Sequence, residues 1–146
     1  MQNIKGKKIL IMGGAGFIGH NLALKIKDLG GLPFVTDGLQ VNNLGYYTSQ
    51  NENNSELYIS FINERLKILR ENNIPINVYD IRDYNLVSQN ISAIKPDVVV
   101  HLAAVAHANR SNKDPFSTFD HSLRTLENVL DTLRNFKNIH LVYFSS

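Results

Sequence analysis

The sequence lacks cysteine altogether, although it contains 146 residues. Disulfides and thiolate metal sites are therefore excluded, and the composition fits a reducing compartment, so we expect a cytoplasmic protein. No apolar run approaches the roughly 20 residues of a membrane span, and the first predicted strand lacks the long apolar core and the small-residue cleavage site of a signal peptide. The five histidines show no spacing typical of a metal site. We accordingly expect neither a membrane partner nor a bound metal.

The chain also has little charge of one sign. Its formal net charge is +2, and the lysines and arginines are scattered along the sequence. This pattern gives no reason to expect nucleic acid as a partner. With 43% hydrophobic and 19% charged residues, a chain of this length is predicted to fold as one globular domain with a substantial core.

Short apolar runs alternate with segments of helical periodicity along the whole chain. The pattern predicts strands at 7–12, 32–37, 74–80, 97–102 and 138–144, and helices at 21–29, 56–73, 83–94 and 115–135. Either Asp83 or Asn85 is expected to open the third of these helices. Because right-handed crossovers join successive strands, this order predicts an α/β fold with a doubly wound parallel sheet of five strands.

Three glycines follow the first predicted strand directly. Gly13, Gly16 and Gly19 lie between that strand and a helix, which is the arrangement that a dinucleotide pyrophosphate requires. The first glycine allows a tight turn, the second lets the backbone approach the phosphates, and the third lets helix and strand pack closely. The free N–H groups at the helix start would face the anion.

An acidic residue, Asp37, ends the second predicted strand, about 20 residues beyond the glycines. A carboxylate at this position accepts hydrogen bonds from the adenosine ribose and repels a 2′-phosphate, which favours NAD over NADP. The alternative is a solvated turn residue, because Asp37 and Gly38 form a common turn pair.

Two further strands end in residues that fit the same cofactor. Asp80 could bind the adenine amino group beside an apolar wall formed by Ile81, or it could instead cap the next helix. The small residues Ala103 and Ala104 after the fourth strand would let a cofactor pass close to the backbone. We assign His101 no role in proton transfer.

Four motifs in this order resemble those of the extended short-chain dehydrogenase/reductase family, specifically its NAD-dependent nucleotide-sugar epimerases and dehydratases. They occupy residues 13–19, 80–83, 101–104 and 141–146; residues 111–115 and 64–69 are similar to a Ser-x-x-x-Pro loop and to an insertion of uronic-acid 4-epimerases. The resemblance implies a Rossmann-type fold and a cofactor site made of Gly13, Gly16, Phe17, Ile18, Gly19, Asp37, Asp80, Ile81, Ala103, Ala104 and Val105.

The chain departs from this family at several positions. Ser122, Thr125 and Asn128 stand where the family has an Asn-x-x-Gly-x-x-Asn pattern, so one asparagine near the cofactor is replaced by serine. No tyrosine has a lysine at the fourth following position, although the family uses this pair for proton transfer. The family's assisting serine or threonine aligns with Ser146, which is our candidate catalytic residue.

The leading hypothesis is that residues 1–146 are an incomplete NAD-binding Rossmann domain, truncated after the fifth strand and without a substrate domain. The parent protein would oxidise the sugar of a nucleotide-sugar transiently and return the hydride, whereas this chain alone would be inactive. One alternative is a non-catalytic module that binds NAD or a partner chain, for instance as a homodimer. Another is an NADP-linked reductase of the same superfamily.

Overall fold

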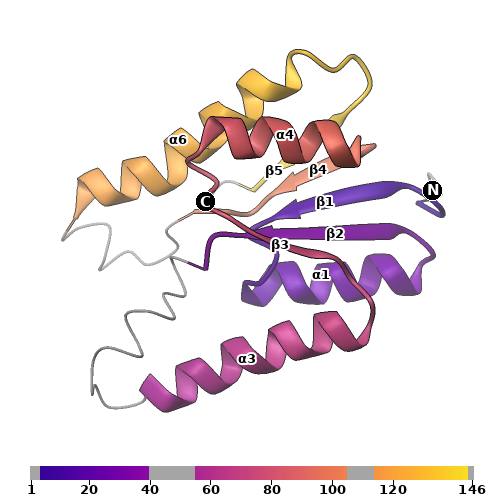
Figure 1. Ribbon diagram of the computed structural model, residues 1–146, viewed down its shortest axis with the longest axis vertical. Helices are drawn as coiled ribbons and strands as arrows, with labels where there is room; N and C mark the ends of the chain where they lie inside the picture. Colours follow the sequence, from indigo (N-terminus) through magenta and orange to yellow (C-terminus); the bar gives the residue numbers. More distant parts are fainter. Residues whose placement is uncertain (1–3, 40–54, 105–113, 145–146) are drawn as a thin grey trace.

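A computed structural model describes residues 4–39, 55–104 and 114–144 of the chain, and all statements below refer to these residues. They form one parallel sheet with helices on both faces (Figure 1). The elements are β1 (Lys8–Met12), α1 (Phe17–Asp28), β2 (Leu32–Asp37), α3 (Ser55–Glu71), β3 (Ile76–Val78), α4 (Tyr84–Ile94), β4 (Val98–His101), α6 (Pro115–Leu133) and β5 (His140–Tyr143). The predicted Rossmann-type α/β fold is therefore confirmed.

The strands lie in the order β3-β2-β1-β4-β5, and every neighbouring pair is parallel. From β1 the chain adds β2 and then β3 on one side of β1, and it then crosses back to place β4 on the other side of β1. The point at which this direction reverses lies between the carboxyl ends of β1 and β4. In doubly wound sheets, ligands bind at this switch point.

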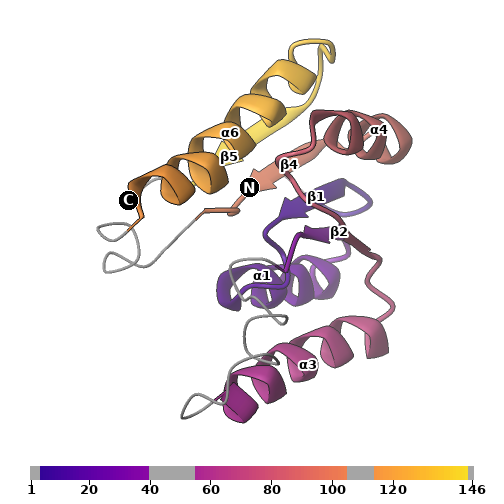
Figure 2. The ribbon, with the colours of Figure 1, turned by 60° about the vertical axis from the view of Figure 1, so that its left-hand side comes forward.

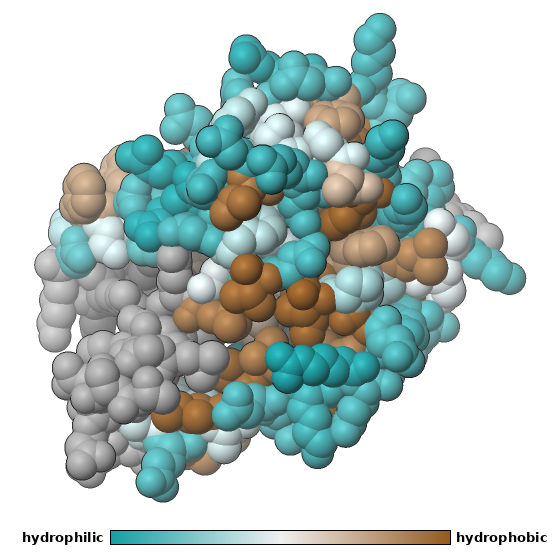
Figure 3. Space-filling model, viewed as in Figure 1, coloured by the Kyte–Doolittle hydropathy of each residue, from teal (hydrophilic) through white to brown (hydrophobic). Residues whose placement is uncertain are grey.

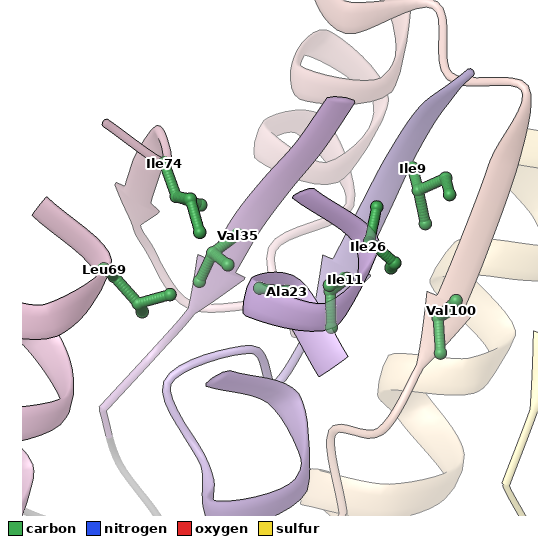
Figure 4. Packing of buried hydrophobic residues seen from close by; sticks show 8 residues of the cluster. All are labelled: Ile9, Ile11, Ala23, Ile26, Val35, Leu69, Ile74 and Val100. Carbon is green, nitrogen blue, oxygen red and sulfur yellow. The ribbon is translucent and has the colours of Figure 1, made fainter. Parts of the chain in front are cut away.

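The central strand β1 supplies side chains to two separate cores. Ile9 and Ile11 join the cluster on the face covered by α1 and α3, which also contains Ala23, Ile26, Val35, Leu69, Ile74 and Val100 (Figure 4). Leu10 and Met12 point to the opposite face, where α4 and α6 lie (Figure 2). The alternation follows from the two-residue period of a strand buried on both faces.

The first helix begins earlier than we predicted from its apolar spacing. The predicted start was residue 21, whereas α1 begins at Phe17, directly after Gly16. Gly19 therefore lies within the first helical turn. Because it has no side chain, that turn can pack against the glycine segment before it, a contact that apolar periodicity does not reveal.

The starts of the later helices agree with local capping chemistry. Asp83 caps α4 by accepting hydrogen bonds from the backbone N–H groups of Asn85, at 2.9 Å, and Leu86, at 3.1 Å. Asp83 is thus the helix-opening residue, and neither Asn85 nor Asp80 has this role. Asp114 caps α6 in the same way, and Pro115 occupies the first helical position, as expected for proline.

The strands β3 and β5 are shorter than the apolar runs that predicted them, and among the described residues each pairs with one strand only. The pairing of β3 with β2 covers three residues, and that of β5 with β4 covers four. Pro75 precedes β3, as its missing N–H requires. Seen from the side of this edge strand, hydrophobic surface lies mainly between the two helical layers (Figure 3).

None of the helices in the described ranges is both long enough and apolar enough to cross a membrane.

Candidate functional site

The turn between β1 and α1 is enclosed by backbone on two sides. Gly13 has a φ of +80°, in the left-handed region that favours glycine. Its N–H donates to the carbonyl of Thr36 at 2.8 Å, which joins the turn to β2. A Cβ on Gly13 would lie 2.8 Å from the backbone nitrogen of Ala103, just after β4. The turn thus lies at the switch point, between the ends of β2 and β4.

The third glycine of the motif is fixed by an even closer approach. A Cβ on Gly19 would lie 2.5 Å from the Cα of Gly14 and 2.7 Å from the carbonyl oxygen of Gly13. Both neighbours are backbone atoms, which cannot turn aside as a flexible side chain can. Gly19 was predicted to let helix and strand pack closely, and the structure shows this close contact with the turn that follows the strand.

The start of α1 offers backbone donors toward the open side of the turn. The first N–H groups of a helix have no acceptor within the helix. The N-cap of α1 is Gly16, and no side chain of the described residues caps this helix. Phe17 and Ile18 are 71% and 57% exposed, which is unusual for large apolar residues. An uncapped, exposed helix start with no acidic residue in its first turn is suited to an anion.

Asp37 lies at the carboxyl end of β2 and is buried, with 8% of its surface exposed. Its carboxylate accepts hydrogen bonds from the N–H of Ala15 at 3.0 Å and of Leu39 at 2.8 Å. Burial raises the pKa of Asp37, and these two hydrogen bonds partly oppose that shift. The carboxylate is therefore not solvated: it is a buried group that ties the glycine turn to β2, and its bond to the N–H of Leu39 is that of a turn residue.

The carboxylate of Asp37 nevertheless retains capacity for a ligand. Each carboxylate oxygen can accept about two hydrogen bonds, and each accepts one from the backbone here. Two hydroxyls of a ribose would complete this arrangement.

His101, at the end of β4, is enclosed rather than presented to the site. It is 1% exposed, its Nδ1 has no partner within the described residues, and its ring stacks on that of Tyr143 at 5.9 Å between centroids. Burial lowers the pKa of His101 to about 4, so the ring is neutral at physiological pH. These features agree with our assignment of no role in proton transfer.

Asp80 and Ile81 follow β3 at the same edge of the sheet. The carboxylate of Asp80 is paired with Arg82, whose Nη2 lies 2.7 Å from it, and Arg82 also binds Asp120 of α6 at 2.5 Å. The side chain of Ile81 is buried in the second core cluster. The structure thus brings Asp80 to the predicted edge already engaged in an ion pair, with about a third of its side chain exposed.

Asn128 has a structural role that its place in the motif did not reveal. It is 9% exposed on α6, and its Nδ2 donates to the carbonyls of Ile81 at 3.1 Å and Arg82 at 2.8 Å. Asn128 therefore holds the segment that carries Asp80. The resemblance singled out Asn128 by position only.

Arg65 of α3 is a second residue that we missed. Its guanidinium carbon lies 5.9 Å from the centroid of the Phe17 ring, at the start of α1. It comes from the helix after the segment 40–54, so only the folded chain shows that it lies near the turn.

The remaining predicted residues have the following places. Ala103 and Ala104 are partly buried beside the turn, whereas Val105 and Ser146 lie outside the described residues. The described part of the chain contains no cluster of three or more residues suited to a metal ion.

The chain can be compared with known proteins on this basis. The family model described as "NAD dependent epimerase/dehydratase family" matches residues 9–146. Protein CapI of Staphylococcus aureus is 32% identical over 139 residues, which cover 95% of this chain and 37% of that protein. A dTDP-D-glucose 4,6-dehydratase of Dictyostelium discoideum is 29% identical and covers 96% of this chain, which spans 29% of that protein.

A solved structure has the same fold over most of this chain. The UDP-glucose 4-epimerase of Thermus thermophilus, in complex with NAD, is 26% identical with a TM-score of 0.70, covering 95% of this chain and 37% of that one. The chain thus spans about a third of the length of these relatives. By its motifs, its fold and its match to the family model, it belongs to the NAD-dependent epimerase/dehydratase family.

Proposed function

We propose that these 146 residues bind NAD and are the cofactor-binding portion of a nucleotide-sugar epimerase or dehydratase. The observation that carries the proposal is the juxtaposition at the switch point: an uncapped helix start beside the buried carboxylate of Asp37. The first group suits a pyrophosphate, and the second suits the hydroxyls of a ribose.

The turn also fits the bulk of a dinucleotide. No side chain projects from Gly13, Gly14 or Gly16, so none stands between a phosphate and the backbone of the turn; a Cβ at Gly13 would instead meet the backbone of Ala103 at 2.8 Å. The backbone N–H groups of Phe17 and Ile18 would hold the pyrophosphate, and Asp37 would orient the adenosine ribose. A bound NAD supplies a hydride acceptor that oxidises a sugar carbon and later returns the hydride.

The other predicted residues would hold the two ends of the cofactor. Ala103 and Ala104, together with Val105, would line the nicotinamide half; they follow β4 in the sequence, and Ala103 lies against Gly13. Asp80 would meet the adenine amino group, where Arg82 competes for its carboxylate.

We further propose that the chain prefers NAD to NADP and that it binds without turning over a substrate. A carboxylate at Asp37 repels a 2′-phosphate, and the solved Thermus thermophilus relative is in complex with NAD. The proton-transfer pair of the family is absent from these 146 residues, and Ser146 alone would not replace it. Nucleotide-sugar chemistry is proposed for a longer protein of which this chain forms the cofactor half.

Calorimetric titration with NAD and with NADP tests the cofactor assignment. The wild-type chain should bind NAD more tightly than NADP, and the Asp37→Asn variant should bind NAD at least tenfold more weakly, because hydrogen bonds to a charged group contribute about 1.5–3 kcal/mol. Tighter binding of NADP, or absence of dinucleotide binding, would contradict the proposal.

A matched control exists at the opposite edge of the sheet. Asp97 also accepts a backbone hydrogen bond, from the N–H of Lys8 at 2.8 Å, but it stands before β4 and far along the strand from the turn. The Asp97→Asn variant should bind NAD as the wild type does.

The proposed lack of turnover has its own test. Incubation of the chain with NAD and a UDP-hexose should yield neither an epimerised nor a dehydrated sugar. Product formed in proportion to the chain would show that these residues are catalytically sufficient.

A further inference from the structure

Helix α3 covers the glycine turn from the outside. Ile62 and Leu66 are buried against Ala15, the residue at the centre of the turn, and Leu39 and Ile76 join the same small cluster. This cluster links α3 both to the turn and to the residues that follow Asp37. The position of α3 relative to the start of α1 is therefore set by apolar packing.

Arg65 stands between these two anchoring residues in the sequence of α3. Its side chain is half-buried, and its guanidinium lies 5.9 Å from the ring centroid of Phe17, within the range of a cation–π contact. Phe17 is the first residue of α1, whose N–H group is among those proposed to bind the pyrophosphate. The packing of α3 thus places a positive charge at the rim of the proposed phosphate site.

The charge of Arg65 is not neutralised by a carboxylate in the part of the chain that the structure describes. The neighbouring acids of α3, Glu64 and Glu71, lie within 4.0 Å of Lys67 instead, and Arg65 takes part in none of the ion pairs among the described residues. Residues 13–19 contain no lysine or arginine of their own. A dinucleotide at this turn would bring negative charge to the start of α1, where Arg65 lies against the ring of Phe17.

We propose that Arg65 is a cofactor-binding residue whose guanidinium binds a phosphate of the dinucleotide at the start of α1. The guanidinium fork suits phosphate oxygens geometrically, and the ring of Phe17 holds it in place. Since the phosphate belongs to the dinucleotide, this inference rests on the proposed function. Both NAD and NADP carry the pyrophosphate that would meet Arg65. NADP also carries a 2′-phosphate of similar chemistry, so the two dinucleotides are compared below.

The test is a set of titrations of the wild-type chain and its Arg65→Gln variant with NAD, NADP and adenosine. Loss of one charge-assisted phosphate contact should weaken NAD binding about tenfold and leave adenosine, which has no phosphate, unaffected. The salt dependence of NAD binding should also become shallower. The Arg70→Gln variant is the matched control, because it removes the same charge from the exposed last turn of α3.

The outcomes distinguish a failure of the role of Arg65 from a failure of the proposed function. A loss for both dinucleotides supports the contact to the pyrophosphate, whereas a loss for NADP alone would contradict it and point to the 2′-phosphate instead. Unchanged binding of both by Arg65→Gln, in a wild type that binds NAD, would overturn the role of Arg65 and leave the proposed function intact. Absence of dinucleotide binding by the wild type would instead overturn the proposed function. If Arg65→Gln proved poorly folded, Arg65→Lys is the second variant: it keeps the charge but loses the guanidinium fork, so it should bind NAD more weakly than the wild type. Wild-type NAD affinity in Arg65→Lys would contradict a contact made by the guanidinium.

Discussion

The glycine turn and the segment from Asp80 to Asp83 lie at the same edge of the sheet but are held in different ways. The turn depends on close backbone approaches, because a Cβ at Gly13 or Gly19 would collide with backbone atoms. The second segment is held by side chains, through the carbonyl contacts of Asn128 and the ion pairs of Arg82. Where backbone atoms lie this close, only glycine fits at the position itself. Where side chains hold a segment, the requirement instead falls on their partners, which are distant in the sequence.

The largest effect that distinguishes these regions is expected at Gly19. The Gly19→Ala variant should lose about 3 kcal/mol of unfolding free energy, as overpacked sites do, and should lose NAD binding, because backbone atoms of the turn would have to move. Urea denaturation and NAD titration measure both effects.

Gly6 provides the control for this substitution. It also has a positive φ, of +74°, but a Cβ there would meet nothing within 4 Å. The Gly6→Ala variant should cost only about 1–2 kcal/mol for the strained backbone and leave NAD binding unchanged. Equal losses in the two variants would show that close packing does not hold the turn.

The next largest effect concerns acidification of the turn region. Burial raises the pKa of Asp37, and the proposed ribose contact needs its charged form. As the pH falls through that raised pKa, NAD affinity should decrease, by about tenfold per pH unit once the group is protonated.

The stability of the free chain should respond to Asp37 in the opposite direction. A raised pKa in the folded state means that this group stabilises the fold below its unfolded pKa and that this contribution is lost as the pH rises through the folded pKa. Comparison of the wild type with Asp37→Asn across acidic and neutral pH isolates both responses. A pH-independent difference in NAD affinity between the two would contradict the assigned role of Asp37.

In the side-chain-held segment, the Asn128→Ala variant should have the larger effect. It leaves the carbonyls of Ile81 and Arg82 without their donor, at a cost of about 2 kcal/mol in unfolding free energy. NAD affinity should fall only several-fold, because Asn128 acts through the position of Asp80. The control is Asn135→Ala, which removes only an exposed contact of 3.5 Å to Asp131. A loss of unfolding free energy no greater than that of the control would show that the hydrogen bonds of Asn128 to these two carbonyls do not stabilise the segment.

The smallest effect is expected for Arg82→Gln. Its ion pairs with Asp80 and Asp120 are partly exposed, and such pairs contribute only about 0–1 kcal/mol. Urea denaturation should therefore show a smaller loss for Arg82→Gln than for Asn128→Ala. The reverse order would mean that the ion pairs, rather than the buried amide, hold this segment.

The same contrast explains how much could be predicted from the sequence. The order of elements, the glycine positions and the place of Asp37 follow from local requirements, namely apolar runs, close approach and the end of a strand. The start of α1 was misplaced because periodicity does not report the contact between Gly19 and Gly14. Arg65 was missed because tertiary packing sets the position of α3 relative to the turn. The pairing of Asp80 with Arg82 was missed because it depends on the folded conformation of the Arg82 side chain.

The central claim is that the glycine turn of this chain binds NAD together with Asp37. An amide chemical-shift titration of the isotopically labelled chain with NAD tests it most directly. We predict that the largest shifts occur at residues 13–19, Asp37 and Ala103, and that Asp37→Asn needs at least tenfold more NAD to reach them. Saturable binding with shifts confined to other parts of the sheet and helices would contradict it.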